Sequence, residues 1–198
     1  MDKGAFVRKW AAAAGSERAE SRSHFDDLCR VLREKTPTEA DPSRSFYMFE
    51  AKAKSEDENG YADAWHRGKF AWEYKGKGKD LREAYAQLNR YRERLENPPL
   101  LVACNFDNYE VHTNWTNTET WIYKFANVDI LGDAPVEVVT ISGTPAKDAR
   151  RLSPLRVLKA LWENPDELRP GKDDRADHRG CREAVRHDRQ GIAQMEGG

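Results

Sequence analysis

The alternation of apolar and polar positions predicts a pair of strands in the middle of the chain. Residues 61–65 form the first strand, residues 66–68 the turn and residues 69–75 the second strand. In the second strand, aromatic side chains alternate with Glu73 and Lys75. Because successive side chains of a strand point to opposite faces, we expect the aromatic residues on one face and Glu73 and Lys75 on the other.

A helical repeat follows this pair of strands. Residues 80–96 place apolar side chains at helical spacing along one side, and Asp80 is a favourable N-cap residue. Gln87 and Tyr91 are four residues apart, so they lie one turn apart on one face of this helix. Residues 99–104 then form a short apolar run that is typical of a buried strand.

The flanking segments predict further helices, loops and strands. Residues 6–34 favour a helix that Gly15 and Ser16 divide into two, with Ser16 capping the second half. Residues 36–44 contain two prolines and predict a loop. Further expected elements are a strand at residues 45–51, a charged loop at residues 53–59, the two arms of a hairpin at residues 109–113 and 120–125, and a helix at residues 152–162.

The charged residues of the two central strands suggest a chemistry. Asp63 lies in the first strand, and its carboxylate is expected to converge with Glu73 and Lys75 of the second. Carboxylate oxygens suit a hard divalent ion such as Mg²⁺, and a nearby lysine can orient the attacking water and stabilise charge in a phosphoryl transition state. This combination predicts cleavage of a phosphodiester. The alternative is a chance pattern, because 34% of the residues are charged.

The order of these features resembles the core of the PD-(D/E)xK nucleases. That core has a strand with an aspartate, a strand with E-x-K, a helix and a buried strand, and Gln87-x-x-x-Tyr91 resembles the motif of its RecB-like branch. The sequence is similar to the N-terminal nuclease domain of MmeI-like, single-chain type II restriction-modification enzymes over residues 6–162. The segments that carry this likeness are G-Y-A-D-A-W, F-A-W-E-Y-K-G-K-G-K-D-L, A-Y-A-Q-L-N-R-Y and P-P-L-L-V-A-C-N-F.

The resemblance implies a fold and a set of roles. The fold would be α/β and restriction-endonuclease-like, with a mixed central sheet flanked by helices, and the reaction would be Mg²⁺-dependent hydrolysis of double-stranded DNA. Asp63 and Glu73 would hold the metal, and Lys75 would position the nucleophilic water. Gln87 and Tyr91 would shape the site and orient the lysine or the DNA backbone.

Residues near the N-terminus add one candidate ligand. Glu17 matches the first-helix glutamate that related nucleases bring to the metal site, so we include it among the metal ligands that the resemblance implies. Glu20 lies nearby on the same helix, and either residue can equally be a solvated helix carboxylate. His24 adjoins the apolar side of this helix, which favours a packed histidine over a catalytic one.

Length limits what the chain contains. In MmeI-like enzymes the nuclease domain precedes a helical spacer, an adenine-N6 methyltransferase and a target-recognition region. At 198 residues the chain is too short for these parts, so S-adenosylmethionine would matter only through the missing methyltransferase. We expect the nuclease domain at residues 1–150 and the start of the spacer at residues 151–171. The alternative is a catalytically silent remnant that acts only as a DNA-binding or interaction module.

Residues 172–198 are rich in arginine, aspartate and histidine and show no amphipathic period, which predicts a disordered tail. A shift of one nucleotide allows an amphipathic helix that resembles the segment after the same position in the family. We therefore hypothesise a frameshift after Gly171, with an ordinary polar tail as the alternative.

Composition excludes several other classes of protein. The net charge of −1 gives no global basicity, although lysines gather near the proposed site, where Lys77 and Lys79 either contact phosphates or form a solvated loop. The three cysteines are widely spaced, which argues against a zinc site or a disulfide framework. Without a long apolar run or a signal peptide, we expect a cytoplasmic protein that does not contact the membrane.

Overall fold

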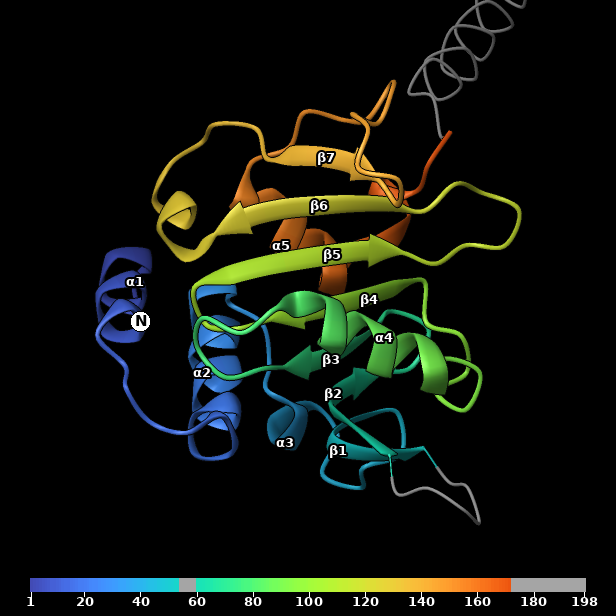
Figure 1. The fold of residues 1–198 in the computed structure, drawn as a ribbon. Helices are drawn as coiled ribbons and strands as arrows, with labels where there is room; N and C mark the ends of the chain where they lie inside the picture. Colours follow the sequence, from blue (N-terminus) through green and yellow to red (C-terminus); the bar gives the residue numbers. More distant parts are fainter. Residues whose placement is uncertain (54–59, 172–198) are drawn as a thin grey trace, which may run out of the picture.

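The computed structural model describes residues 1–53 and 60–171, and its centre is one mixed sheet of seven strands (Figure 1). The strands lie side by side in chain order from β1 to β7. They are β1 (Tyr47–Ala53), β2 (Gly60–His66), β3 (Phe70–Tyr74), β4 (Leu100–Cys104), β5 (Asn108–Thr113), β6 (Trp121–Ala126) and β7 (Glu137–Thr140). Neighbouring strands are antiparallel except for β3 and β4, which are parallel.

Helix α4 (Leu81–Tyr91) supplies the crossover that a parallel pair such as β3 and β4 requires. Its first turn is capped by Asp80, whose carboxylate accepts a hydrogen bond from the Arg82 backbone N–H at 2.9 Å. The buried Leu88 packs with Ala71 and Leu101, which come from β3 and β4. Since side chains alternate along β3, α4 covers the face of the sheet that also carries Glu73.

Helices α1 (Lys3–Ala11), α2 (Glu17–Leu32) and α5 (Pro154–Glu163) contribute to the main hydrophobic core, which contains the aromatic side chains of β3. Phe25 of α2 packs edge-on against Trp72, with ring centroids 5.3 Å apart. Trp162 of α5 donates a hydrogen bond from Nε1 to the Tyr47 hydroxyl at 2.9 Å. The aromatic residues of β3 and its charged residues therefore lie on opposite faces, as the alternation predicts.

This architecture confirms the fold class that the sequence indicated, a mixed α/β sheet flanked by helices and consistent with a restriction-endonuclease-like fold. The turn between β2 and β3 contains Gly68 at a φ of 68°, a left-handed conformation that glycine adopts at little cost. The strand over residues 99–104 and the hairpin of β5 and β6 are also confirmed.

Two expected elements differ from the structure. Helix α4 ends at Tyr91 rather than at residue 96, and residues 92–96 continue as turns up to Glu96 and Asn97, whose φ values of 62° and 47° a right-handed helix cannot contain. Residues 36–44 contain a short helix, α3 (Pro37–Ala40), where a loop was expected. The reason is a capping box between Thr36 and Glu39.

The N-terminus of α2 also differs from the expectation. Ser16 occupies the N-cap position, but its side chain makes no capping hydrogen bond. Instead the Glu20 carboxylate accepts a hydrogen bond from the Gly15 backbone N–H at 2.9 Å. The strand β7 and the 3₁₀ helices η1 (Asn127–Leu131) and η2 (Pro165–Leu168) were not predicted.

Helix α5 lies within the segment assigned to the start of a spacer, and it packs in the main core. Val157, Leu158, Ala160 and Leu161 have no exposed surface. The loop expected at residues 53–59 falls almost wholly, and the tail at residues 172–198 wholly, outside the described residues. Within the described ranges, no helix is long and apolar enough to cross a membrane.

Candidate functional site

The site is centred on Asp63, where the regular alternation of β2 is interrupted. Ala62 packs with the α4-side cluster, whereas Ala64, two residues further along, packs in the main core on the opposite face. Paired residues of β2 and β3 run only from His66 to Ala64, so the two strands separate at Asp63. The Asp63 side chain fills this opening, and its Oδ2 accepts a hydrogen bond from the Tyr74 backbone N–H at 2.7 Å.

The environment of Asp63 disfavours its charge. Burial raises the pKa of Asp63 to about 6, partly offset by the Tyr74 N–H donor. The negative charges of Glu17 and Glu50 raise this pKa further, and the Lys75 ammonium lowers it. Three acidic residues from three different elements, α2, β1 and β2, are thus close enough to interact.

Glu73 is the most buried carboxylate of the site, with 4% of its surface exposed. Burial, and then the charge of Asp63, raise the pKa of Glu73 to about 8, against the lowering effect of Lys75. Its Oε1 accepts a hydrogen bond from Lys75 Nζ at 3.0 Å. Its Oε2 is buried without a hydrogen-bond partner among the described residues. Burying a carboxylate oxygen without a partner costs folding free energy unless a further donor or a cation completes its environment.

Lys75 lies between the strand and the helix of the candidate site. Its Nζ donates to Glu73 Oε1 and, at 3.1 Å, to Gln87 Oε1 of α4. An ammonium has three donors, and these contacts use two of them. Gln87 therefore contacts Lys75, and its role in orienting the lysine, which the resemblance implies, stays a prediction.

Tyr91, the second polar residue of that helix face, has a different setting. It is 7% exposed and packs in the apolar cluster with Trp65, Leu88 and Leu95. The structure therefore shows a packing residue at this position. A role for Tyr91 in orienting the lysine stays a prediction.

Glu17 reaches the site from the first turn of α2. Gly76 directly follows Lys75 in the sequence, and Glu17 Oε2 lies close to it. A side chain at position 76 would place its Cβ atom 3.9 Å from this oxygen. Its charge raises the pKa of both Asp63 and Glu73. Glu20, in contrast, is bound to the Gly15 backbone N–H and serves the entry into α2.

Glu50 is a member of the cluster that the sequence did not predict. It lies in β1 between Phe49 and Ala51, whose partners are Ala64 and Ala62, so it stands opposite Asp63. Its φ of 52° is unusual for a glutamate within a strand and marks a second local distortion at the same level of the sheet. In the sequence, Glu50 lies between two apolar residues of an expected strand. The alternation of faces along a strand places such a residue in solvent, so it gave no sign of a role in the site.

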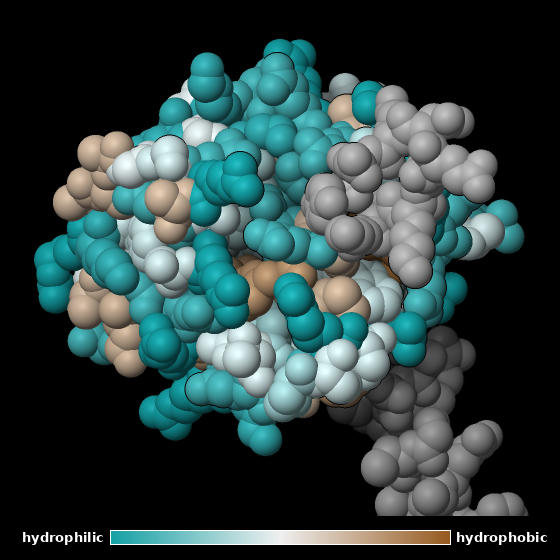
Figure 2. All heavy atoms as spheres, turned by 90° about the horizontal axis from the view of Figure 1, so that it is seen from below, coloured by the Kyte–Doolittle hydropathy of each residue, from teal (hydrophilic) through white to brown (hydrophobic). Residues whose placement is uncertain are grey.

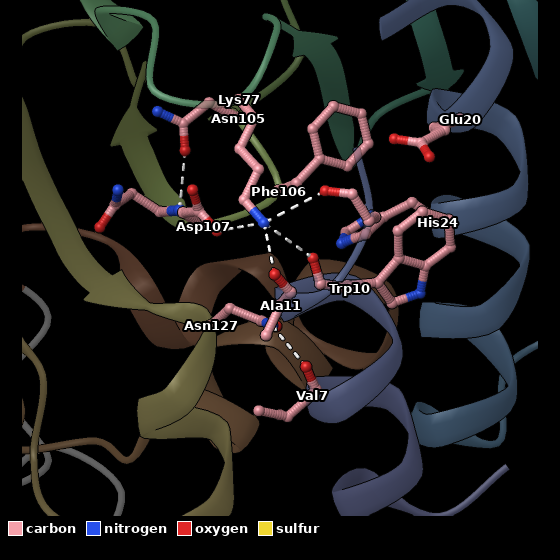
Figure 3. Close-up of polar contacts among 12 residues, drawn as sticks. Val7, Trp10, Ala11, Glu20, His24, Lys77, Asn105, Phe106, Asp107 and Asn127 are labelled. Carbon is pink, nitrogen blue, oxygen red and sulfur yellow. Dashed lines mark hydrogen bonds and ion pairs between the residues drawn. The ribbon is translucent and has the colours of Figure 1, made fainter. Parts of the chain in front are cut away.

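The lysines after β3 do not share one role. Lys77 Nζ donates to the Ala11 carbonyl at 2.6 Å and to those of Trp10 and Ala13 at 3.3 Å, and lies 3.4 Å from Asp107 (Figure 3). It therefore binds the C-terminal carbonyls of α1, which attract a positive charge. This contact makes Lys77 part of the packing of α1 and not a free phosphate ligand. Lys79 is exposed.

His24 is a packed residue, as its position predicts. It has no exposed surface, and its two ring nitrogens lie 2.7 Å from the Tyr74 hydroxyl and 3.1 Å from the Tyr109 hydroxyl. Burial lowers the pKa of His24 to about 3, so the ring is neutral at ordinary pH. Its ring packs against those of Trp10 and Phe106, with centroids 4.8 and 5.3 Å away (Figure 3).

The chemistry of the predicted donors, all carboxylates, suits a hard cation. Asp63, Glu73 and Glu17 present carboxylate oxygens, and Glu73 Oε2 is unpartnered within the described part of the chain. In the part of the chain that the structure describes, however, no group of three or more His, Cys, Asp and Glu side chains could hold a metal ion as it stands, so Glu17 as a third ligand stays a prediction. The free cysteines Cys29 and Cys104 are buried elsewhere in the core.

A comparison with protein families decides the relationship of this chain. The family described as MmeI, N-terminal domain, matches residues 1–177, most of the sequence. The chain belongs to this family. The resemblance to the N-terminal domain of MmeI-like enzymes is thereby confirmed. No curated protein and no solved structure matches the chain.

Proposed function

We propose that this member of the MmeI N-terminal domain family is the nuclease domain of a restriction-modification enzyme and hydrolyses DNA phosphodiesters with Mg²⁺. The observation that carries the proposal is the position of Lys75, bound to both Glu73 and Gln87 beside a second buried carboxylate, Asp63. If Glu73 and Lys75 formed only a structural ion pair, they would not need Asp63 nearby, whose charge raises the pKa of Glu73. Paired carboxylates with perturbed pKa values are typical of functional sites.

Asp63 and Glu73 would hold the metal ion, with Glu17 as the further ligand that the resemblance implies, and the ion would supply Lewis-acid activation of the scissile phosphate and its attacking water. Mg²⁺ commonly uses one or two carboxylates and completes its shell with waters and substrate phosphate oxygens, so a site that is not closed by protein ligands suits it. Its charge would also relieve the mutual repulsion of Asp63 and Glu73.

Lys75 would act on the nucleophile. The contacts with Glu73 and Gln87 hold its ammonium at a defined place and leave one N–H for a water or a phosphate oxygen. At that place the lysine can orient the attacking water and stabilise the charge that develops on the phosphate. Gln87 is a positioning residue in this scheme.

Metal binding tests the site separately from DNA cleavage. Titration of Mn²⁺, a Mg²⁺ substitute, into the chain by calorimetry should show one site that Asp63→Asn weakens at least about ten-fold, because a neutral amide is a poorer ligand for a hard cation. Asp107→Asn, a partly exposed aspartate that contacts Lys77, is the matched control and should leave the affinity unchanged. Equal affinities of Asp63→Asn and the parent would contradict the proposed ligand set.

A further inference from the structure

A groove runs beside Asp63 along the edge strand β1. It has a volume of about 1190 Å³ and is lined by α2, the segment before β1, β1 itself, β2 with its following turn, and the segment after α4. This volume exceeds that of ordinary small-molecule sites, which supports a polymeric occupant. Figure 2 views the molecule from the side of β1 and α3 and shows hydrophilic side chains around a small recessed apolar area.

Among the described residues that line the groove, every basic residue is an arginine. These arginines are Arg18, Arg22, Arg44, Arg67 and Arg94. They come from four separate stretches of the chain and are all exposed. The acidic residues Glu17, Glu50, Asp63 and Glu96 line the same groove. Arginine binds phosphates in a planar, two-pronged geometry that lysine cannot match, so this composition favours phosphate groups over a diffuse basic surface.

Three of the arginines lie on the α2 side of the edge strand. Arg18 and Arg22 are four residues apart on α2 and project from the same side of the helix. The Arg22 guanidinium lies over the Phe49 ring at 4.8 Å, and Arg44 donates from Nη2 to the Phe49 carbonyl at 3.1 Å. Phe49 therefore holds both guanidinium groups at the start of the groove.

The other two arginines lie on the side where α4 ends. Arg67 is paired with Glu96 at 2.9 Å and lies 5.5 Å from the Trp65 ring centroid. Arg94 follows α4 and lines the same wall as Leu95. Because α2 and α4 pack on opposite faces of the sheet, the two sets approach the groove from opposite faces, and Glu50 and Asp63 line the same groove.

We propose that this groove holds the sugar–phosphate backbone of duplex DNA. Arg18, Arg22 and Arg44 bind phosphates on one side of β1, Arg94 binds on the other, and the phosphate between them is placed at Asp63. This inference rests on the proposed function, because Asp63 marks the position of the scissile phosphate. The arginines also offset the negative charge of the site, which would otherwise repel the DNA backbone.

Binding of a short, fluorescently labelled DNA duplex by the full chain, measured by anisotropy in EDTA, tests the groove without cleavage. Arg18→Gln combined with Arg22→Gln should weaken binding about ten-fold and reduce the slope of log K against log salt by about 2, because about one counterion is released per phosphate contact. Arg94→Gln should reduce that slope by about 1. Thermal unfolding of each variant confirms that the fold is retained.

Arg8→Gln is the matched control, since Arg8 is an exposed arginine of α1 outside the groove, and it should bind like the parent. A parent chain that fails to bind duplex DNA at low salt, or groove variants with the parent's affinity and salt slope, would overturn the inference. Polyglutamate that competes as well as DNA would overturn the assignment to a nucleic acid. Failure of DNA cleavage alone would count against the proposed chemistry and not against the groove.

Discussion

At the scale of single residues, the Glu73 carboxylate is the group whose placement opposes folding most clearly. It is 4% exposed, has one oxygen without a partner among the described residues, and faces a second carboxylate. Buried acids that destabilise the metal-free fold are expected at sites selected for binding a cation rather than for stability.

This argument predicts a stability gain for Glu73→Gln in the absence of metal. The pKa of Glu73 is raised from 4.5 to about 8, so the folded state binds more protons than the unfolded state between these values. The contribution of Glu73 to the free energy of unfolding of the metal-free chain therefore falls as the pH rises from about 4.5 to about 8. Removing the charge should raise the free energy of unfolding by on the order of 1–2 kcal/mol near the upper value.

Urea unfolding in EDTA across this pH range measures the effect. Glu83→Gln, at an exposed position on α4, controls for a general effect of losing a negative charge. A loss of stability in Glu73→Gln that grows with pH would contradict the account of a strained buried acid.

The sequence predicted that Glu73 and Lys75 point to the same face, because side chains two residues apart in an extended strand share a face. Helical spacing predicted only that Gln87 and Tyr91 share a face, and the expectation that Gln87 reaches Lys75 came from the resemblance. Glu50 could not be found from periodicity, because its positive φ interrupts the strand that the period assumes. The setting of Tyr91 was also not predictable, since a tyrosine on this helix face can turn its hydroxyl to the site or its ring into the apolar cluster.

At the scale of elements, α4 links the site to the sheet. Leu88 anchors the helix in the cluster with Ala71 and Leu101, and the adjoining residue Gln87 reaches Lys75. The Tyr85 ring adds a second anchor, stacked on His112 of β5 with ring centroids 3.9 Å apart. The position of Gln87 thus depends on the apolar packing of its near neighbours on the helix.

We predict that Leu88→Ala destabilises the chain by about 3 kcal/mol, because it removes buried methyl groups and leaves a cavity beneath α4. Chemical unfolding measures this loss. Arg90→Ala, at an exposed position on the same helix, should change stability by less than about 0.5 kcal/mol. Equal effects of the two substitutions would show that α4 is not held by this cluster.

Elements were predictable where local sequence alone decides them. Strands β2 and β3 carry their alternation and their glycine turn, and α4 carries its cap and its repeat. The helix α3 was hidden by its two neighbouring prolines, although the Thr36 and Glu39 pair is a recognisable capping box. The early end of α4 depends on the turn that lets Trp65 Nε1 donate to the Leu95 carbonyl at 2.9 Å, a tertiary contact.

At the scale of the whole molecule, the fold brings four segments to one point. Helix α2 contributes Glu17, β1 contributes Glu50, β2 contributes Asp63, and β3 contributes Glu73, with Lys75 directly after it. The arginine groove has the same property, since its residues lie far apart in sequence and meet only in the folded chain. No local pattern could have predicted that arrangement.

The central claim is that Asp63, Glu73 and Lys75 form a metal-dependent nuclease centre, and cleavage of duplex DNA with Mg²⁺ tests it most directly. The assay uses the chain joined to the methyltransferase and target-recognition regions of its family. Asp63→Ala and Lys75→Ala should each reduce the cleavage rate by at least about a hundred-fold while the fold is retained, because each removes a group that acts on the transition state. Arg8→Gln should cut like the parent. Undiminished cleavage by Asp63→Ala would contradict the account.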